Sequence, residues 1–431
     1  MTAQPAAAGA APERVGRRFV VLMACLALSS LGNGLCFPFT SIYISQLLGL
    51  GSGGTGGYFI AMAAASFAAA LLGGPLADRA GPHKVAALGG TALGVGYAML
   101  APAHGAPLVL ASGACVGVGF GLFYAAVVGV VDAAVPERLR RTAFTVRHIV
   151  NNVGIGAGSV LAGLALHGAD TPTATLRWLY VANAAAALPL VAVVWAVRPR
   201  GGRNVVPRAA DGGGDSPTYR TLLRSGPMAL LVLAQALFAI VGFTQIEATV
   251  PLLMHDRMAV TLGWVSAVVA ANSFALVALQ PLARRWFERL PETVSLAVGP
   301  VLWAAAFGCG LLAAVLGDGG DGSGGSDNGG GPAVRYGLLL AFAVLFAAGE
   351  LTYSSAYYPL LLRWSGEAAV GRASALASLA WNLGTASGPP LGLFVIGHTP
   401  AAGSWLALAA GAGAAFAVAA ALHRRAAAHV E

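Results

Sequence analysis

Residues 74–84 read GPLADRAGPHK, a short polar stretch between two long apolar runs. Asp78 and Arg79 end the run that precedes the stretch, and Lys84 begins the run that follows it. A helix needs about 20 apolar residues to cross the hydrocarbon core of a membrane, and both neighbouring runs have about that length. The stretch is therefore predicted to be a tight loop between two membrane-spanning helices.

The composition of the whole chain is that of a membrane protein. Of 431 residues, 57% are hydrophobic and 10% are charged, and the mean hydropathy is +0.74. Soluble domains carry about 25% charged residues. The net charge of +8 comes almost entirely from Arg in short gaps between apolar runs, since Lys84 is the single Lys. This pattern excludes a disordered chain, a nucleic-acid-binding protein and a secreted disulfide scaffold.

Twelve apolar runs of membrane-spanning length can be counted along the chain. The first follows Arg17 and Arg18 but is too long for the core of a signal peptide, so it is predicted to be a retained helix. The runs cover residues 19–44, 57–77, 84–102, 107–131, 142–166, 176–197, 227–253, 261–283, 294–316, 336–362, 371–397 and 402–422.

The positions of the basic residues predict the orientation of these helices. With the N-terminus in the cytoplasm, 22 of the 25 basic residues fall in cytoplasmic segments, and the other three, in outer loops, are Arg177, Arg257 and Arg335. The positive-inside rule then places both termini in the cytoplasm. The sequence therefore predicts an all-α, multi-pass protein of the cytoplasmic membrane with 12 transmembrane helices surrounded by lipid.

Internal similarity divides the chain into two halves. Residues 75–79 (PLADR) and 281–285 (PLARR) end the second and eighth runs at an offset of 206. In the fifth and eleventh runs, Ala143, Asn152, Gly154 and Gly158 match Ala373, Asn382, Gly384 and Gly388 at an offset of 230. The glycine-rich outer loop 317–334 is of the right size to account for the difference. Parallel repeats of six helices are therefore expected. The predicted plan is a tail (1–18), a six-helix bundle (19–197), a linker (198–226), a second bundle (227–422) and a tail (423–431).

The stretch 74–84 resembles GxLADRxGR(K/R), the signature of the major facilitator superfamily, and lies in the loop that carries it there. Within that superfamily the chain looks most like the twelve-helix drug:proton antiporters, through residues 280–282, Gly349 with Glu350, and residues 371–389. The resemblance implies two six-helix pseudo-repeat bundles, a monomer, and transport by alternating access.

Three departures from the family pattern bear on coupling and direction. Pro82 stands where Arg is usual, and Gly113 stands where many proton-coupled members carry Arg. Residues 158–163 lack the proline of a pattern that is associated with antiporters. These departures leave uptake open as an alternative to export.

The resemblance also implies a conformational latch at the cytoplasmic side. The signature Asp of the family matches Asp78, and there it faces the start of the eleventh helix, here near Gly371. A carboxylate at that place meets the unpaired backbone N–H groups of a helix N-terminus. The alternative is a set of ordinary solvated loop charges. The predicted latch residues are Gly74, Asp78, Arg79, Gly81, Lys84 and Asp132, with Arg79 and Lys84 placed to pair with Asp132.

Two intramembrane acids are the candidates for proton coupling. Glu350 lies about fourteen residues from the outer end of its run, and a charge near mid-membrane costs about 2.5–3.5 kcal/mol on insertion scales for Asp. This cost favours the protonated form, so the group can load and release a proton. A structural Glu bonded to neighbouring helices is the alternative. Glu247 lies nearer the outer end and could equally belong to an outer gate or to the wet interface.

Seven further residues are predicted to line a substrate cavity. In the family that the chain resembles, helices one, four, seven and ten line this cavity, and helices five and eleven flank it. Arg147 could hold an anionic substrate group, pair with Asp132 or extend to the cytoplasm. Tyr353 and Tyr357 share a helix face with Glu350 by their spacing. The seven are Asn33, Tyr124, Arg147, Asn152, Tyr353, Tyr357 and Asn382.

No enzyme motif is present in the sequence. There is no GxSxG, no HExxH and no Walker-type loop, so we expect no catalytic residue, no metal site and no cofactor. The expected function is secondary transport, with export of a small organic molecule or drug in exchange for protons. A uniporter or a proton symporter for uptake is the first alternative, and a non-transporting membrane sensor on the same fold is the second.

Overall fold

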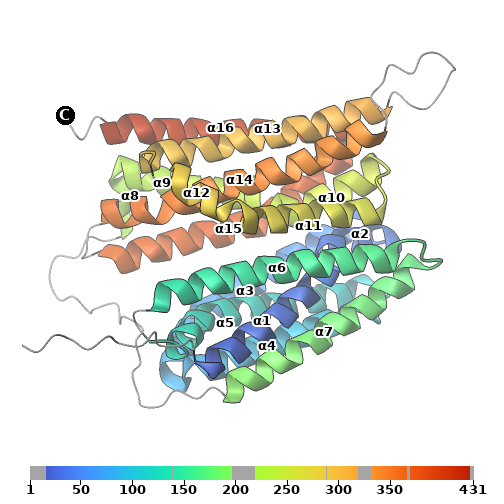
Figure 1. The fold of residues 1–431 in the computed structure, drawn as a ribbon, viewed down its shortest axis with the longest axis horizontal. Coiled ribbons are helices and arrows are strands. Elements are labelled where there is room, and N and C mark those ends of the chain that lie inside the picture. The colour runs from blue at the N-terminus through green and yellow to red at the C-terminus, as the bar shows by residue number, and fades with distance from the viewer. Residues whose placement is uncertain are drawn as a thin grey trace, which may run out of the picture.

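The computed structural model describes residues 16–136, 139–196, 219–287, 289–318, 332–365 and 369–427. Every regular element in these ranges is a helix. The helices form two bundles that face each other, one from blue to green and one from yellow to red (Figure 1). The first contains α1 (Arg17–Cys36), α3 (Gly51–Ala80), α4 (Pro82–Leu100), α5 (Ala106–Ala133), α6 (Arg140–Leu166) and α7 (Pro172–Ala196). The second contains α9 (Gly226–Leu237), α11 (Leu262–Ala278), α13 (Glu292–Asp318), α14 (Pro332–Ser365), α15 (Val370–His398) and α16 (Ala401–Ala427), with the short α8 (Tyr219–Arg224) and α12 (Gln280–Phe287).

Each of the twelve predicted runs coincides with a helix or with a series of helical segments in the described residues. The run 261–283 is divided between α11 and α12. In the part of the chain that the structure describes, nine helices are long and apolar enough to cross a membrane. The count of 12 crossings, the cytoplasmic placement of the termini and the domain boundaries stay predictions. Much of the predicted linker and of the loop 317–334 lies outside the described residues.

Two helices change from α-helical to 3₁₀ or π hydrogen bonding at equivalent places in the two halves. After α1 the chain continues as η1 (Phe37–Phe39, a 3₁₀ turn), α2 (Thr40–Ile42) and η2 (Tyr43–Leu47, a π-helix). After α9 it continues as η4 (Phe238–Phe243), η5 (Gln245–Thr249), α10 (Val250–Leu252) and η6 (Leu253–Arg257), in which all three η segments are π-helices. Pro38 and Pro251 each remove a backbone donor in these stretches. The segments α2 and α10 contact each other where the two bundles meet (Figure 1).

The predicted repeat is visible in how two pairs of helices pack. Gly154 on α6 and Gly384 on α15 each lie where an added Cβ would meet the backbone of a neighbouring helix. The absence of a side chain therefore permits this close approach. The neighbours of Gly154 are Ala27, Ser30 and Leu31. The neighbours of Gly384 are Ala236, Ala239 and Ile240, and each of these lies 209 positions after the corresponding neighbour of Gly154.

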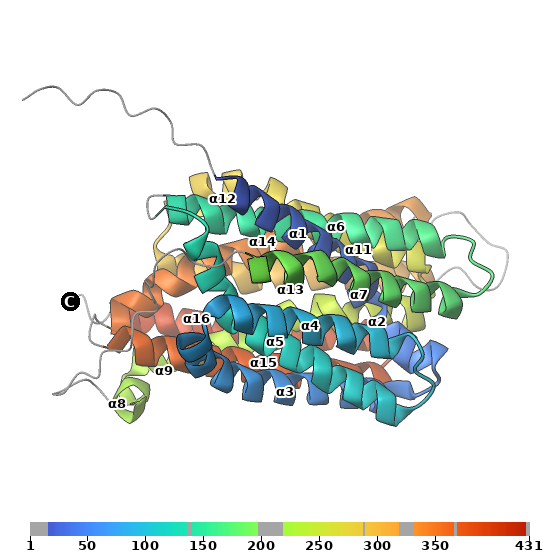
Figure 2. The same ribbon diagram turned by 90° about the horizontal axis from the view of Figure 1, so that it is seen from below.

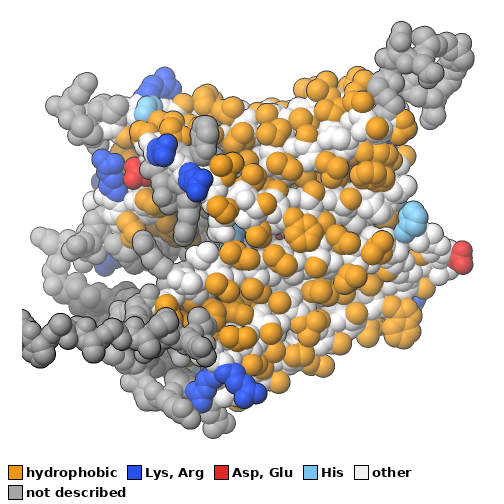
Figure 3. All heavy atoms as spheres, in the orientation of Figure 1, with side chains coloured by type: hydrophobic (Ala, Val, Ile, Leu, Met, Phe, Trp, Pro, Cys, Tyr) orange, Lys and Arg blue, Asp and Glu red, His pale blue; other side chains and the backbone are white. Residues whose placement is uncertain are grey.

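Charge separates the two ends of the molecule. The face seen in Figure 3 is mostly hydrophobic along the helices, and most of the visible Lys and Arg side chains gather at one end. We call this the basic end; α1, α4, α9, α13 and α15 begin there (Figures 1 and 2). The positive-inside rule predicts that the basic end is cytoplasmic and that the opposite end, with α2 and α10, is the outer end.

The two bundles touch along two pairs of helices. One pair is α6 with α11, and the other is α3 with α15 (Figure 2). Near the outer end of α6, a Cβ added to Gly163 would lie 2.7 Å from the Cβ of Ser266 on α11. The bundles therefore approach closely at the end where α2 meets α10.

Candidate functional site

Both predicted proton carriers lie on the second bundle, close to each other. Glu247 is in the π-helix η5, Glu350 is in α14, and both side chains are half-buried. Their carboxyl groups are within electrostatic reach of each other. Single-turn π segments often occur at functional sites. The structure thus brings together two acids that are 103 positions apart in the sequence.

Tyr124 joins this pair from the first bundle. The side chain, on α5, is 55% exposed, and its ring lies beside Phe120 with centroids 5.8 Å apart. The phenol is within electrostatic reach of Arg147 on α6 and of Glu247 in the other bundle. Tyr124 therefore lies within electrostatic reach of charged groups on both bundles, and its place in a substrate cavity stays a prediction.

Arg147 contributes a positive charge to the same region. It is half-buried, one to two turns from the start of α6, and its Nε is buried without a hydrogen-bond partner among the described residues. The side chain of Asp132, with which Arg147 could pair, lies outside the described part of the structure. A half-buried guanidinium with unused donor capacity can donate a hydrogen bond to an anionic or carbonyl oxygen.

The repeat-related asparagines make the same local hydrogen bond. Asn152 donates from Nδ2 to the carbonyl of His148 at 3.0 Å, and Asn382 donates to the carbonyl of Ser378 at 2.8 Å. Each therefore bonds its own helix four residues back. Asn152 is buried, whereas Asn382 and Asn33 are half-buried. Within the described part of the chain, no hydrogen bond or ion pair joins these three residues to the two acids, and their role in binding stays a prediction.

Tyr353 and Tyr357 lie buried inside the second bundle. The Tyr353 hydroxyl donates to Oε1 of Gln235 at 2.6 Å, and its ring stacks on Phe238 with centroids 3.6 Å apart. Tyr357 stacks on Tyr353 at 5.3 Å, and its hydroxyl has no hydrogen-bond partner among the described residues. In this conformation both rings contribute to the packing beside Glu350, and their contact with substrate stays a prediction.

Gln235 and Phe238 are functional candidates that the analysis of the sequence missed. An amide inside an apolar run is an expensive group, so Gln235 carried a signal of the same kind as Glu350. Phe238 carried none, because one more Phe in an apolar run is indistinguishable from a packing residue. Phe238 also lies 4.9 Å from the ring of Trp303 and 6.0 Å from that of Trp381, centroid to centroid.

Removing the Tyr353 hydroxyl is expected to destabilise the second bundle. The variant Tyr353→Phe leaves Oε1 of buried Gln235 without its donor, at a cost of about 1 kcal/mol for a hydrogen bond between helices in a membrane. Reversible unfolding in mixed micelles measures the change. The double variant Gln235→Leu/Tyr353→Phe should recover most of the loss, because neither polar partner is then left unpaired. Native stability in Tyr353→Phe would contradict this account of the hydrogen bond.

The structure explains why one position of the predicted cytoplasmic latch is a glycine. Gly81, between α3 and α4, has φ +93°, a conformation that residues with a Cβ rarely adopt. Arg79 and Lys84 are exposed at the basic end. The side chains of Asp78 and Asp132 lie outside the described part of the structure, so the contacts of the latch stay a prediction.

The described residues contain no group of three or more His, Cys, Asp or Glu that could hold a metal ion. The constellation that they do contain is two acids, a phenol and a guanidinium, contributed by both bundles. Such a site can exchange a proton and bind a polar or charged group of a ligand, because its charges lie in an otherwise apolar surrounding.

Comparisons with known proteins agree with this architecture. A family profile described as Major Facilitator Superfamily matches residues 22–321. A search of curated proteins gave no match. Among solved structures, the nucleoside transporter NupG has a TM-score of 0.69 at 14% identity, covering 95% of this chain and 99% of that one.

Two further solved structures share the fold. The POT family transporter PepTSo has a TM-score of 0.70 at 14% identity, and the match covers 96% of this chain and 99% of that one. A bacterial homologue of the human lysosomal transporter Spinster, inward-facing and unoccupied, has a TM-score of 0.65 at 12% identity, with 96% of each chain covered. At these identities the likeness shows the fold alone.

Proposed function

The chain belongs to the major facilitator superfamily, and from this premise we propose that it exports a small organic molecule from the cell in exchange for protons. Membership makes the protein a multi-pass membrane transporter and not an enzyme. The direction, the coupling ion, the substrate class and the cell membrane as its location belong to the proposal.

The observation that carries the proposal is the proximity of Glu247 and Glu350. Two carboxylates repel each other when both are ionised, and this repulsion is strong where little water screens it. Either a proton or a cationic group relieves the repulsion. A proton and a cationic substrate therefore compete for one negatively charged site, and this competition is the physical requirement of exchange.

The placement of Tyr124 and Arg147 supports alternating access. These two residues belong to the first bundle and the acids belong to the second, so a rocking motion of the bundles changes the distances between them. The surrounding aromatic rings suit a lipophilic or weakly cationic molecule. In this proposal the predicted latch at Asp78 closes the basic end when the outer end opens.

Transport by the purified protein in liposomes tests the direction and the coupling. Inside-out proteoliposomes with an acidic interior are expected to accumulate ethidium, used as a lipophilic cation, and to lose internal protons as they do so. If ethidium instead crosses the membrane in the same direction as the protons, the result would favour a symporter for uptake. Flux that is independent of the gradient would favour a uniporter. Binding of ethidium without flux would favour a sensor.

A further inference from the structure

We propose that Gln46, Asp256 and Arg257 form an outer latch, a polar chain that ties the two bundles together at the end opposite the basic end. Gln46 belongs to η2 of the first bundle, and Asp256 and Arg257 belong to η6 of the second. Only the role of the outer latch in the transport cycle rests on the proposed function, because the contacts themselves are present in the structure.

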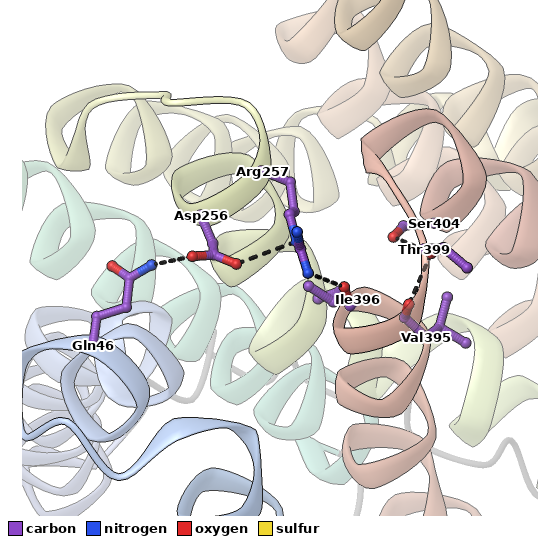
Figure 4. A network of polar contacts seen from close by, with 7 residues as sticks. All are labelled: Gln46, Asp256, Arg257, Val395, Ile396, Thr399 and Ser404. Atoms are coloured by element: carbon purple, nitrogen blue, oxygen red, sulfur yellow. Dashed lines mark hydrogen bonds and ion pairs between the residues drawn. The ribbon is translucent and has the colours of Figure 1, made fainter.

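Two hydrogen bonds and an ion pair make up the outer latch (Figure 4). Nε2 of Gln46 donates to Oδ1 of Asp256 at 2.7 Å, across the two bundles. The other carboxylate oxygen, Oδ2, forms an ion pair with Arg257, whose Nε lies 3.4 Å away. Nη2 of Arg257 donates to the carbonyl of Ile396 at 2.7 Å. The chain therefore runs from the first helix of one bundle to α15 of the other.

The far end of the chain lies where a cation is favoured. Ile396 is in the last turn of α15, which ends at His398, and the final carbonyls of a helix carry partial negative charge. Beside it, Oγ1 of Thr399 donates to the carbonyl of Val395 at 2.8 Å and lies 2.9 Å from Oγ of Ser404 (Figure 4). These bonds order the corner between α15 and α16 against which Arg257 rests.

The exposure of the outer latch suits a contact that must break. The contact that breaks is the hydrogen bond between Gln46 and Asp256, because Asp256 and Arg257 both belong to η6 and stay together. The Asp256 side chain is 40% exposed, so water replaces Gln46 as its partner when the bundles separate. A hydrogen bond that water can replace contributes little net stability. A buried pair at the same place would resist opening, because its groups would lose partners that nothing replaces.

A second contact connects the outer latch with the candidate site. Oγ of Ser41, in α2, donates to the carbonyl of Ala248 at 2.8 Å, and this bond is buried. Ala248 follows Glu247 directly and lies in the π-helix η5. Separation of the outer ends would release this carbonyl in the segment that carries the acid. The opening of the outer latch is thereby coupled mechanically to the position of Glu247.

Distances between spin labels test the outer latch without substrate or a proton gradient. Labels on Thr171→Cys, before α7, and Thr261→Cys, before α11, report the separation of the outer ends, with the four native cysteines replaced by Ala. Asp256→Ala is expected to move part of the distance distribution to longer values. The control, Arg177→Ala, removes a contact with His104 inside the first bundle and should leave the distribution unchanged.

Cross-linking then tests the role of the outer latch in the cycle. In Gln46→Cys/Asp256→Cys, a short reducible bis-thiosulfonate reagent is expected to stop ethidium transport, and dithiothreitol is expected to restore it. The matched pair His104→Cys/Arg177→Cys joins two positions within one bundle and should transport normally when cross-linked. Equal label distances in Asp256→Ala and Arg177→Ala, or full transport by the cross-linked Gln46–Asp256 pair, would overturn the proposal. If no variant transports ethidium but Asp256→Ala still opens the outer end, the proposed function fails and the outer latch stands.

Discussion

Glu350→Gln is expected to reduce ethidium transport driven by a pH gradient to the level of protein-free liposomes. Gln keeps the shape and polarity of the side chain but has no ionised form, so it can neither carry the proton nor balance a cation. It also removes the electrostatic interaction with Glu247, which leaves one acid where the native protein has two. Ethidium fluorescence and a pH-sensitive dye inside the vesicles measure both fluxes.

The matched control is an acid of the same protein far from the site. Glu292, at the start of α13, pairs with Arg363 at 3.8 Å and is 45% exposed. Glu292→Gln should therefore transport as the native chain does. Monodisperse elution of both variants in detergent shows that they are folded. Coupled transport at the native rate in Glu350→Gln would remove this residue from the mechanism.

Gly158→Val is expected to abolish folding of the first bundle. A Cβ at this position would collide with the carbonyl oxygen of Leu31 and would lie 3.0 Å from the Cα of Gly34, so the collision is with backbone. Overpacking of a core costs about 1–3 kcal/mol, and a rigid helix backbone gives way less than a side chain does. The yield of protein that elutes as a single species from membranes measures the loss.

Substitutions at two other glycines serve as controls for this prediction. Gly308 on α13 has no neighbouring atom within 4 Å of an added Cβ, so Gly308→Val should accumulate normally. Gly388 is the repeat counterpart of Gly158, but there the nearest group is the side chain of Thr244. Gly388→Ala should therefore be tolerated better than Gly158→Ala. The reverse order would show that the α1–α6 contact is looser than the structure indicates.

The helices were predictable because the thickness of the hydrocarbon core sets a length that the sequence must satisfy. The twelve runs coincide with helices or helical series, and the 230-residue offset between Gly154 and Gly384 corresponds to equivalent packing. The type of helix within a run, α or π, was not predictable. Nothing in residues 238–257 distinguishes a π-helix from an α-helix, because hydrogen-bond register leaves no compositional trace.

The candidate site was predictable in part, for a related reason. Glu247 and Glu350 are conspicuous because ionisable groups are expensive in apolar runs. The periodicity of α14 also grouped Tyr353 with Glu350, but spacing along one helix does not reveal the partner helix, and Tyr353 bonds Gln235. The outer latch gave no signal, since Gln46 and Asp256 are ordinary polar residues near predicted helix ends and only the fold brings them together.

Alternating access of the region around Tyr124 is the central claim, and thiol labelling from each side measures it directly. A single cysteine, Tyr124→Cys, is placed in the protein lacking its four native cysteines, and a membrane-impermeant maleimide is applied to right-side-out and inside-out vesicles. Labelling is expected from both faces, with the faster face reversing when the pH gradient is reversed. Labelling from one face alone under every gradient, or from neither face, would contradict the claim.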